Sequence, residues 1–504
     1  MSPLLISILI VVISILALFI WCNARMPKEP PGPFRFPIIG NMLQIYFLGK
    51  NEPFKAYTEL GKRYGDIFSV KLGTINAVVF NSYELMEKYM RKHEFSDRYC
   101  NEWFLERTFS KRLGMVNGEY GTPEWSEIKK FSMRSLSQYG FGKTTKMHSI
   151  LEEEVTNSVE EMKKMAKENG GVVTIGKQFA VSNINLVWAT AAGKRYPLSD
   201  PKFKQLVNNV HSFASSFNMA SSFCFCYPSW YEWLPFMKGH VQSQRKGLLE
   251  INTFFKDFMT ERRKIGKYLT EPECMIDEYL REMDTNEENK SYTDEHLAGL
   301  LSDLFFAGSV TTSATIGWCF LHLLLNPEVQ RKVQEEVDAV VPKGKFPIAE
   351  TEAKLHYVKA TIAETHRIGT ATPMMAPRGT LGDEVCENFI IRKGTFIMSN
   401  IYKLHFDEKY WKDPHTFRPE RFLDKDGIFK NDERLRAFGF GKRRCPGEGL
   451  TQLDLTYFVT MYMQHFTFLP VPGEPLPRSD PLVTAINQPH PFRALLVSRD
   501  GKDW

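Results

Sequence analysis

One cysteine, set among glycines and arginines, carries the clearest chemical signal in the sequence. The segment reads Phe438-Gly-Phe-Gly441-Lys-Arg443-Arg-Cys445-Pro-Gly447. Glycines on both sides allow the backbone to approach Cys445 closely, and the charge of Arg443 favours thiolate over thiol. A thiolate presented from such a loop can be an axial ligand of heme iron. A chance match to this pattern has an expectation on the order of 10⁻⁴, so a stray cysteine is a poor explanation.

A long apolar segment contains an unusual group of small and hydroxyl residues. Thr293-Asp-Glu is typical of a helix start, and the periodicity over 296–325 predicts a helix about 45 Å long. Within it, Ala307-Gly-Ser-Val-Thr311-Thr312 interrupts a run of Leu and Phe. Close helix packing, with threonine hydroxyls bonded to i−4 carbonyls, is the simpler explanation. A helix opened beside a bound ligand is the alternative.

Two other segments pair Glu with Arg. Glu364-Thr-His-Arg367 falls in a predicted helix over 353–368, where the i, i+3 spacing puts acid and base on one face. Downstream, Phe417-Arg-Pro-Glu-Arg421-Phe422 predicts a polar turn. Exposed pairs of this kind are common and weak, so neither segment by itself indicates a site.

The N-terminus differs from the rest of the chain. Residues 1–24 contain no charged side chain, and ~20 apolar residues in a helix span a ~30 Å bilayer core. We predict a membrane anchor there, and Arg25 and Lys28 after it place the remainder on the cytosolic side. A cleaved signal peptide is the alternative, although its apolar stretch is usually shorter and preceded by charge. The prolines of residues 25–41 predict a stiff connector, followed by one domain over 42–504.

The composition is that of an ordinary globular protein. The chain has 504 residues, of which 43% are hydrophobic and 24% charged. A net charge of +5 argues against a protein that binds nucleic acid through a strongly basic surface over the whole molecule. The 8 cysteines show no paired spacing, which indicates reduced thiols rather than a disulfide framework.

Taken together, these motifs resemble the cytochrome P-450 family of heme-thiolate monooxygenases, in its microsomal, membrane-anchored form. The similarity runs from the apolar N-terminus to the C-terminus. Leu323-Leu-Leu-Asn-Pro-Glu-Val-Gln and Pro419-Glu-Arg-Phe422 are most similar to the animal drug- and steroid-metabolising branch. The resemblance implies the cytochrome P-450 fold, mainly α with a small β lobe, preceded by one transmembrane helix. It also implies heme b as the cofactor.

The resemblance assigns roles to particular residues. Cys445 becomes the iron ligand, with Phe438 beside the thiolate, and Glu364, Arg367 and Arg421 form a buried network that supports the heme core. The remaining residues expected around the cofactor are Gly441, Arg443, Gly447, Trp125, Lys129, Arg378 and Ala307. Among them, Trp125, Lys129 and Arg378 are expected to contact the heme propionates. The family usually has Arg where this chain has Lys129, so a compact ammonium group replaces a planar guanidinium that can bind a carboxylate with two hydrogen bonds.

Thr311 is the expected catalytic residue, because the family holds a water against bound dioxygen with this hydroxyl. The family usually has Asp or Glu immediately before it, and this sequence has Val310. Ser309, Ser313 or ordered water are the candidates left for proton delivery.

The expected substrate is apolar: a steroid, terpenoid, fatty acid or xenobiotic. Six residues are expected to face the distal pocket: Ala307, Thr311, Met374, Met375, Leu482 and Val483. A cluster of aromatic residues is expected to line an access channel, dip into the membrane or pack in a helix core: Phe213, Phe217, Phe223, Phe225, Tyr227, Trp230, Tyr231, Trp233 and Phe236.

The family also implies partners and a location. Electrons are expected from NADPH through a flavoprotein reductase, with cytochrome b5 as a second partner, in the endoplasmic reticulum membrane. A basic face is expected to bind the acidic reductase, and it comprises Lys442, Arg443, Arg444, Lys129, Lys130 and Arg134. Two alternatives remain open. One is a heme-thiolate isomerase or dehydratase that works without NADPH, and the other is a non-catalytic heme protein that binds gas or ligand.

Overall fold

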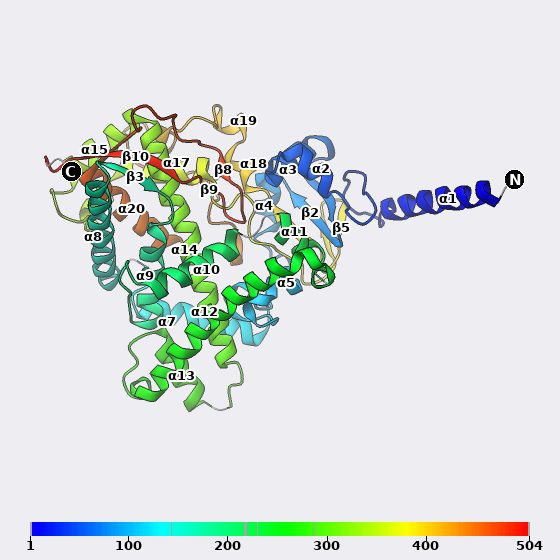
Figure 1. Ribbon diagram of the computed structural model, residues 1–504, viewed down its shortest axis with the longest axis horizontal. Coiled ribbons are helices and arrows are strands. Elements are labelled where there is room, and N and C mark those ends of the chain that lie inside the picture. The colour runs from blue at the N-terminus through cyan, green and yellow to red at the C-terminus, as the bar shows by residue number, and fades with distance from the viewer. Residues whose placement is uncertain (1–2, 143, 216–218, 229, 287, 502–504) are drawn as a thin grey trace.

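A single apolar helix projects from a large helical body in the computed structural model (Figure 1). Residues 3–142, 144–215, 219–228, 230–286 and 288–501 are described. The helices are α1 Pro3–Asn23, α2 Met42–Gly49, α3 Pro53–Tyr64, α4 Tyr83–Tyr89, α5 Glu102–Leu105, α6 Gly114–Asn117, α7 Pro123–Gln138, α8 Thr145–Glu168, α9 Phe179–Ala192, α10 Pro201–Ser215, α11 Met219–Cys226, α12 Lys238–Ile265, α13 Met275–Thr285, α14 Asp294–Leu325, α15 Pro327–Val340, α16 Ala349–Lys354, α17 His356–Gly369, α18 Ile401–His405, α19 Glu408–Trp411 and α20 Glu448–His465.

Short strands form small separate sheets beside the helices. They are β1 Ile67–Leu72, β2 Ile75–Phe80, β3 Val172–Ile175, β4 Glu384–Cys386, β5 Phe389–Ile391, β6 Phe396–Ser399, β7 Phe466–Leu469, β8 Pro481–Leu482, β9 Gln488–Pro489 and β10 Phe492–Ser498. In one three-stranded sheet, β1 and β2 are antiparallel and β6 pairs with β2 in parallel, so residues 396–399 join residues 67–80. The expectation of a mainly α fold with a small β lobe is confirmed.

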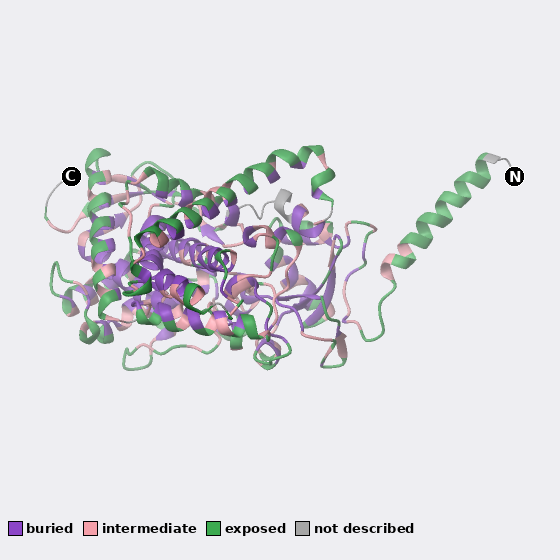
Figure 2. Cartoon of the chain, turned by 90° about the horizontal axis from the view of Figure 1, so that it is seen from below, coloured by how far each residue is buried: buried purple, intermediate pink, exposed green. Residues whose placement is uncertain are grey.

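Helix α14 crosses the interior of the body. Its 32 residues correspond to about 48 Å. The predicted cap is present, because the Thr293 hydroxyl accepts a hydrogen bond from the His296 N–H at 3.1 Å. Helices α9, α10, α17 and α20 pack against it, and Figure 2 shows the resulting buried centre. A helix placed in this way can carry side chains to both the core and an internal site.

The N-terminal helix has a different environment. Its span Leu4–Asn23 has a mean hydropathy of 3.1 and is not buried against the body, whereas α14, which is also long and apolar, is largely covered by protein. Burial therefore separates a core helix from a candidate membrane span (Figure 2). The anchor over residues 1–24 stays a prediction, as do the connector and the single domain that follow it.

Candidate heme site

Cys445 lies in a tight loop between the 3-10 turn Gly441–Arg443 and helix α20. Its N–H donates to the Phe438 carbonyl at 2.9 Å, which folds the loop back on itself. Gly441 has φ +59°, and a Cβ there would lie 2.5 Å from the Met90 carbonyl oxygen, so the loop needs glycine at this position. The Cys445 side chain is exposed, although its neighbours Phe440 and Arg443 are buried. The loop therefore holds a thiol at an accessible point within a packed segment.

The electrostatics of the thiol differ from the sequence-based expectation. Burial, which is the largest effect, raises the pKa of Cys445, because protein surrounds the loop even though solvent reaches the sulfur. Backbone N–H groups of Gly447 and Glu448 and the charge of Arg444 act in the opposite direction. Arg444 is the cation among the main influences on the thiol, whereas the Arg443 side chain turns toward the carbonyls of residues 96, 115 and 118. An effect of Arg443 on the thiol stays a prediction.

Helix α14 presents a narrow accessible stripe. Ala307 is exposed and Thr311, one turn later, is half-buried, while Ser309, Val310 and Thr312 are buried. The Thr311 hydroxyl donates to the Ala307 carbonyl at 2.7 Å. On another side, a Cβ at Gly308 would lie 2.6 Å from a Val187 methyl group, so this glycine permits close packing with α9. The close-packing explanation of the hexamer is therefore supported, while an opening beside a bound ligand stays a prediction, since α14 is continuous over Asp294–Leu325.

Three arginines converge without acidic partners. Arg443 Nε donates to the Ser96 carbonyl at 2.8 Å. Arg378 Nη2 donates to the Phe440 carbonyl at 2.6 Å. Arg98 Nη1 donates to the Ala376 carbonyl at 3.0 Å. In the described parts of the chain, no Asp or Glu lies within ion-pair distance of these three guanidinium groups. The Nε atoms of Arg98 and Arg378 are buried and lack a hydrogen-bond partner there.

This arginine cluster (Arg98, Arg378 and Arg443) fits two carboxylates. Burial lowers the pKa of Arg378 most, and the charges of Arg98 and Arg443 lower it further. Because a guanidinium does not lose its proton in proteins, the shift reflects the cost of holding like charges together. A heme carries two propionates, and arginine forks match carboxylates geometrically. The donors present therefore fit the cofactor, and Arg98 is a member that sequence reasoning missed.

Trp125 and Lys129 lie beside this cluster. Trp125 Nε1 and Arg443 Nη1 donate to the same Met115 carbonyl, at 3.1 and 2.9 Å. Lys129 Nζ lies 4.9 Å from the centroid of the Trp125 ring and donates to the Lys442 carbonyl at 3.3 Å. Burial and the neighbouring Arg443 lower the pKa of Lys129. The lysine therefore adds positive charge at the edge of the same region.

We expect Arg98→Met to weaken heme retention by about tenfold or more, because a charge-assisted hydrogen bond contributes ~1.5–3 kcal/mol. The measurement is the rate at which heme leaves the purified holoprotein for an excess of apomyoglobin. Arg63→Met, at the end of α3, is the matched control and should leave the rate unchanged. An unchanged rate in Arg98→Met would show that Arg98 does not hold the cofactor.

Glu364, Arg367 and Arg421 meet in one buried network. Arg367 donates to both Glu364 carboxylate oxygens, at 2.7 and 2.8 Å, and both side chains are 0% exposed. Arg421 Nε lies 3.4 Å from the same carboxylate, and the Arg418 backbone N–H donates to it at 2.9 Å. On the same helix α17, the His366 ring packs edge-on against the Phe438 ring, with 5.0 Å between the ring centroids. The network is thereby coupled to the cysteine loop.

The expected distal residues lie on three segments that the structure joins. The Trp318 indole of α14 donates to the Asn487 carbonyl, whose N–H donates to the Ala371 carbonyl, at 3.1 and 2.8 Å. Met374 and Met375 follow Ala371, and Met375 contacts Gly439 of the cysteine loop. Leu482, in β8, is exposed, and Val483, which follows it before β9, is half-buried. Tertiary contacts thus bring these elements to α14 and to the loop.

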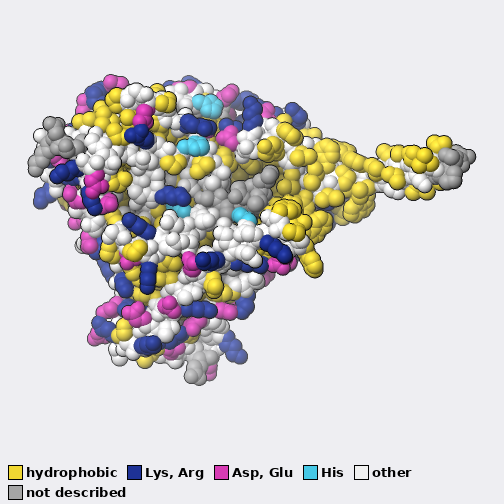
Figure 3. Space-filling view, in the orientation of Figure 1, with side chains coloured by type: hydrophobic (Ala, Val, Ile, Leu, Met, Phe, Trp, Pro, Cys, Tyr) yellow, Lys and Arg dark blue, Asp and Glu magenta, His cyan; other side chains and the backbone are white. Residues whose placement is uncertain are grey.

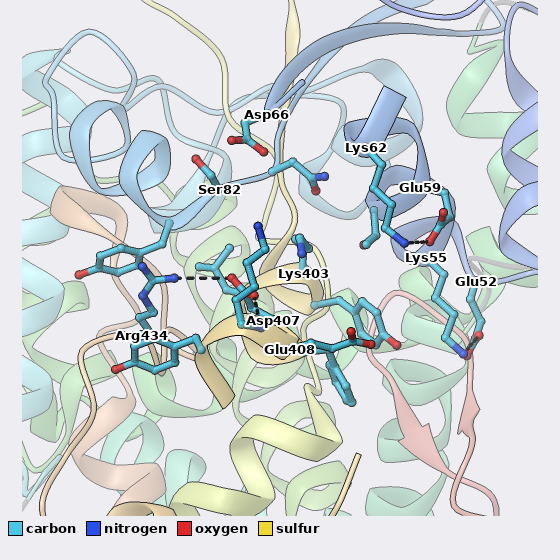
Figure 4. A pocket seen from close by; sticks show the side chains of 18 of the residues that line it. Glu52, Lys55, Glu59, Lys62, Asp66, Ser82, Lys403, Asp407, Glu408 and Arg434 are labelled. Atoms are coloured by element: carbon cyan, nitrogen blue, oxygen red, sulfur yellow. Dashed lines mark hydrogen bonds and ion pairs between the residues drawn. The ribbon is translucent and has the colours of Figure 1, made fainter. Parts of the chain in front are cut away.

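The large surface cleft in Figure 4 is a separate feature. It has a volume of about 1020 Å³ and lies between α3 and α18. Its charged side chains form local pairs, such as Lys62 with Glu59 at 2.7 Å. None of the predicted heme-site residues lines it. The cleft therefore has no part in the site built around Cys445.

The fold and this site define a cytochrome P450, and the chain belongs to that family: the family model for cytochrome P450 matches residues 30–496. The protein is thus a heme-dependent monooxygenase, an oxidoreductase. Among curated relatives, a farnesoate epoxidase of Bombyx mori is 32% identical, with 90% of each chain covered. Cytochrome P450 2J2 of Homo sapiens is 32% identical over 90% of this chain and 88% of its own. Cytochrome P450 2D10 of Mus musculus is 30% identical over 94% of this chain and 93% of its own.

Proposed function

We propose that this protein inserts one oxygen atom from O₂ into an apolar substrate, using electrons that a flavoprotein reductase draws from NADPH. The observation that carries the proposal is the accessible Cys445 thiol together with the arginine cluster, which forms no ion pair among the described residues. Heme bound through Cys445 would supply the activation of O₂. Cys445 would bind the iron, and the arginine cluster, with Trp125 and Lys129, would hold the propionates.

The chain's own residues then have distinct tasks. Phe438 borders the cysteine loop, while Gly441 and Gly447 shape it. The network of Glu364, Arg367 and Arg421 fixes α17 against that loop. On α14, Ala307 offers a small surface beside the reacting centre, and the Thr311 hydroxyl can release the Ala307 carbonyl to hold a water or donate a proton.

An apolar substrate fits the residues proposed to surround it. Ala307, Met374, Met375, Leu482 and Val483 supply aliphatic and thioether surface, and methionines adapt to irregular shapes. One relative is named for farnesoate, a terpenoid acid. Steroids, terpenoids, fatty acids and xenobiotics therefore form the test set, with farnesoate among the terpenoids.

The proposed reductase surface is smaller than the sequence indicated. Arg443 is buried and cannot contribute to it, which corrects that part of the expectation. Lys442, Lys130 and Arg134 are exposed, and Arg444 forms a bidentate pair with Glu448 at 2.7 Å. Docking of an acidic partner, the reductase or cytochrome b5, at this surface should weaken as salt increases.

A membrane location is supported by more than α1. Hydrophobic side chains gather on the surface next to this helix (Figure 3). The large hydrophobic side chains that are exposed in the chain include Ile38, Phe47, Trp233 and Phe236, the last two being 83% and 74% exposed. Of the other predicted aromatics, Trp230 is exposed, whereas Phe225, Tyr227 and Tyr231 are buried. Phe217 lies outside the described residues. We propose the endoplasmic reticulum membrane, with the body on the cytosolic side.

Incorporation of labelled oxygen tests the function. Reconstituted protein, reductase and NADPH under ¹⁸O₂ should give product carrying one labelled atom from at least one member of the substrate set. Omission of NADPH should abolish that product. Rearrangement of an oxygenated lipid without NADPH, with no labelled product, would instead indicate the isomerase or dehydratase. A thiolate-type spectrum with neither reaction would favour a non-catalytic heme protein.

A further inference from the structure

The end of the N-terminal helix α1 is bonded to the connector that follows it. Asn23, the last residue of α1, accepts a hydrogen bond on Oδ1 from the Arg35 backbone N–H at 2.8 Å. Its Nδ2 donates to the Arg35 carbonyl at 3.0 Å, so one amide side chain pairs with both backbone groups of residue 35. One turn earlier, the Phe19 ring stacks on the Phe34 ring, with 5.7 Å between the ring centroids. The last turn of α1 is therefore held against residues 34 and 35.

Arg25, two residues after α1, ties the connector to the body. Its Nη1 donates to the Ser69 hydroxyl of β1 at 2.7 Å and to the Pro30 carbonyl at 2.9 Å. Its Nη2 donates to the Gly32 carbonyl at 2.7 Å. A Cβ at Gly32 would lie 1.9 Å from the Ser69 carbonyl oxygen, so only glycine permits this close approach of the connector to β1. One guanidinium thus bonds both the connector and the sheet.

Two further interactions fix the connector. Arg35 is 6% exposed, forms an ion pair with Glu29 and donates from Nη2 to the Ser69 hydroxyl at 3.1 Å. The Lys28 carbonyl accepts a hydrogen bond from the Ile390 N–H of β5 at 2.8 Å. We call the side chains that make these bonds the clasp, and it comprises Asn23, Arg25, Glu29, Arg35 and Ser69.

The clasp distinguishes this connector from a flexible tether. Its arginines make charge-assisted hydrogen bonds, which are stronger than neutral ones and keep a segment from opening locally. Residues 27–33 include four prolines, each with a fixed φ. Helix α1 itself is continuous over 21 residues, or about 32 Å. The direction of α1 is therefore fixed relative to the body.

The segments near the clasp carry exposed hydrophobic side chains. Phe36 and Ile38 belong to the connector, Phe47 to helix α2 that follows it, and Val385 to the hairpin of β4 and β5. Hydrophobic side chains cover the surface beside α1 in Figure 3. Such side chains can enter the headgroup region of a bilayer through apolar burial alone, without attraction to anionic lipid.

We propose that the clasp makes α1 a rigid mount, which holds the body in one orientation on a lipid bilayer with this hydrophobic surface against the headgroups. The inference rests on the proposed membrane location and adds how the body is oriented there. The partner is the surface of a neutral phospholipid bilayer. A flexible tether would leave the orientation to the hydrophobic surface alone, so the two arrangements differ in what happens when that surface is made polar.

Linear dichroism of the heme absorption band measures the orientation of the body. The holoprotein is reconstituted in oriented phosphatidylcholine bilayers, where a body in one orientation gives a dichroic signal and a freely tumbling body gives none. The surface variant makes four exposed positions polar: Ile38→Ser, Phe47→Ser, Trp233→Ser and Phe236→Ser. We expect this variant to keep the wild-type signal, because the mount alone sets the orientation.

The clasp variant carries Asn23→Ala and Arg25→Lys. It keeps the positive charge after α1, and with it the topology, but loses the planar fork of donors. Combined with the surface variant, it should lose most of the dichroic signal. Lys28→Arg, at an exposed connector position, is the matched control and should keep the signal in the same combination. Heme content and the carbon monoxide spectrum should match wild type in every variant, which shows that the body is folded.

Hydrogen exchange tests the clasp without a bilayer. In detergent micelles, the Arg35 amide should exchange about tenfold faster in Asn23→Ala than in wild type, because it loses its acceptor. Lys28→Arg should leave this rate unchanged. An equal rate in Asn23→Ala and wild type would overturn the clasp.

The dichroism has two results that would overturn the mount. One is loss of the signal in the surface variant while the clasp is intact, and the other is a retained signal in the combined clasp and surface variant. Wild-type protein that does not sediment with vesicles would reject the membrane location and the mount that rests on it. A slowly exchanging Arg35 amide in that protein would then show that the location failed and not the clasp.

Discussion

Replacing Cys445 with serine should abolish the absorption band that carbon monoxide produces with reduced, thiolate-ligated heme. A serine hydroxyl is not ionised near neutral pH and does not give iron the electron density of a thiolate. The loop itself should persist, because its turn depends on the backbone bond from Cys445 to Phe438 and on Gly441. Oxygen insertion should fall to background in the same variant.

The measurement is the reduced carbon monoxide difference spectrum, with heme content determined separately. Cys100→Ser is the matched control, since this half-buried thiol lies 3.9 Å from the Asn117 carbonyl and a hydroxyl can keep that contact. Its spectrum should equal that of wild type. An unchanged thiolate band in Cys445→Ser would reject Cys445 as the ligand, and with it the proposed geometry of the site.

Features with a local cause could be predicted from the sequence. The start of α14 follows from the Thr293 cap, and the contact between Glu364 and Arg367 follows from i, i+3 spacing on one helix. The turn around Cys445 follows from glycines placed where a side chain would collide. In each case, a few neighbouring residues determine the geometry.

Features that depend on distant segments were missed or misassigned. Arg443 follows the loop motif, yet its side chain turns to carbonyls of residues 96, 115 and 118, and no local pattern specifies this direction. Arg98 joins the same cluster through contacts with a segment near residue 376. His211 meets Ser309 across 98 residues of sequence. Periodicity reports which face is buried, but not which buried polar groups meet.

The arginine cluster and the network around Glu364 differ in how their buried charges are balanced. In the network, the carboxylate of Glu364 lies among Arg367 and Arg421, and backbone carbonyls accept the remaining donors. In the cluster, backbone carbonyls accept the hydrogen bonds of three cations, and Asp97 and Asp303 act on them without an ion pair. The network is therefore complete within the chain, whereas the cluster lacks ion-pair partners among the described residues, and the propionates proposed to bind there would supply counter-charges.

Glu364→Ala should destabilise the folded protein by about 3–5 kcal/mol, because it leaves Arg367 as an uncompensated buried charge. A loss of this size is a large part of the ~5–15 kcal/mol that stabilises a typical domain. The urea midpoint of the heme absorption band, measured for wild type and variant, reports the change. Arg418→Ala is the control: its side chain pairs with Asp413 with both groups about 40% exposed, and such pairs contribute ~0–1 kcal/mol.

The double variant Glu364→Leu with Arg367→Met separates the cost of a lone buried charge from the value of the pair itself. It removes both charges from positions that are 0% exposed, and Arg421 keeps Asp413 as its partner, so no unpaired ion remains. We expect it to be more stable than Glu364→Ala, because buried ion pairs can often be exchanged for apolar residues at little cost. Equal or greater destabilisation of the double variant would show instead that the hydrogen bonds from Arg367 to the carbonyls of His405 and Thr416 maintain the position of α17.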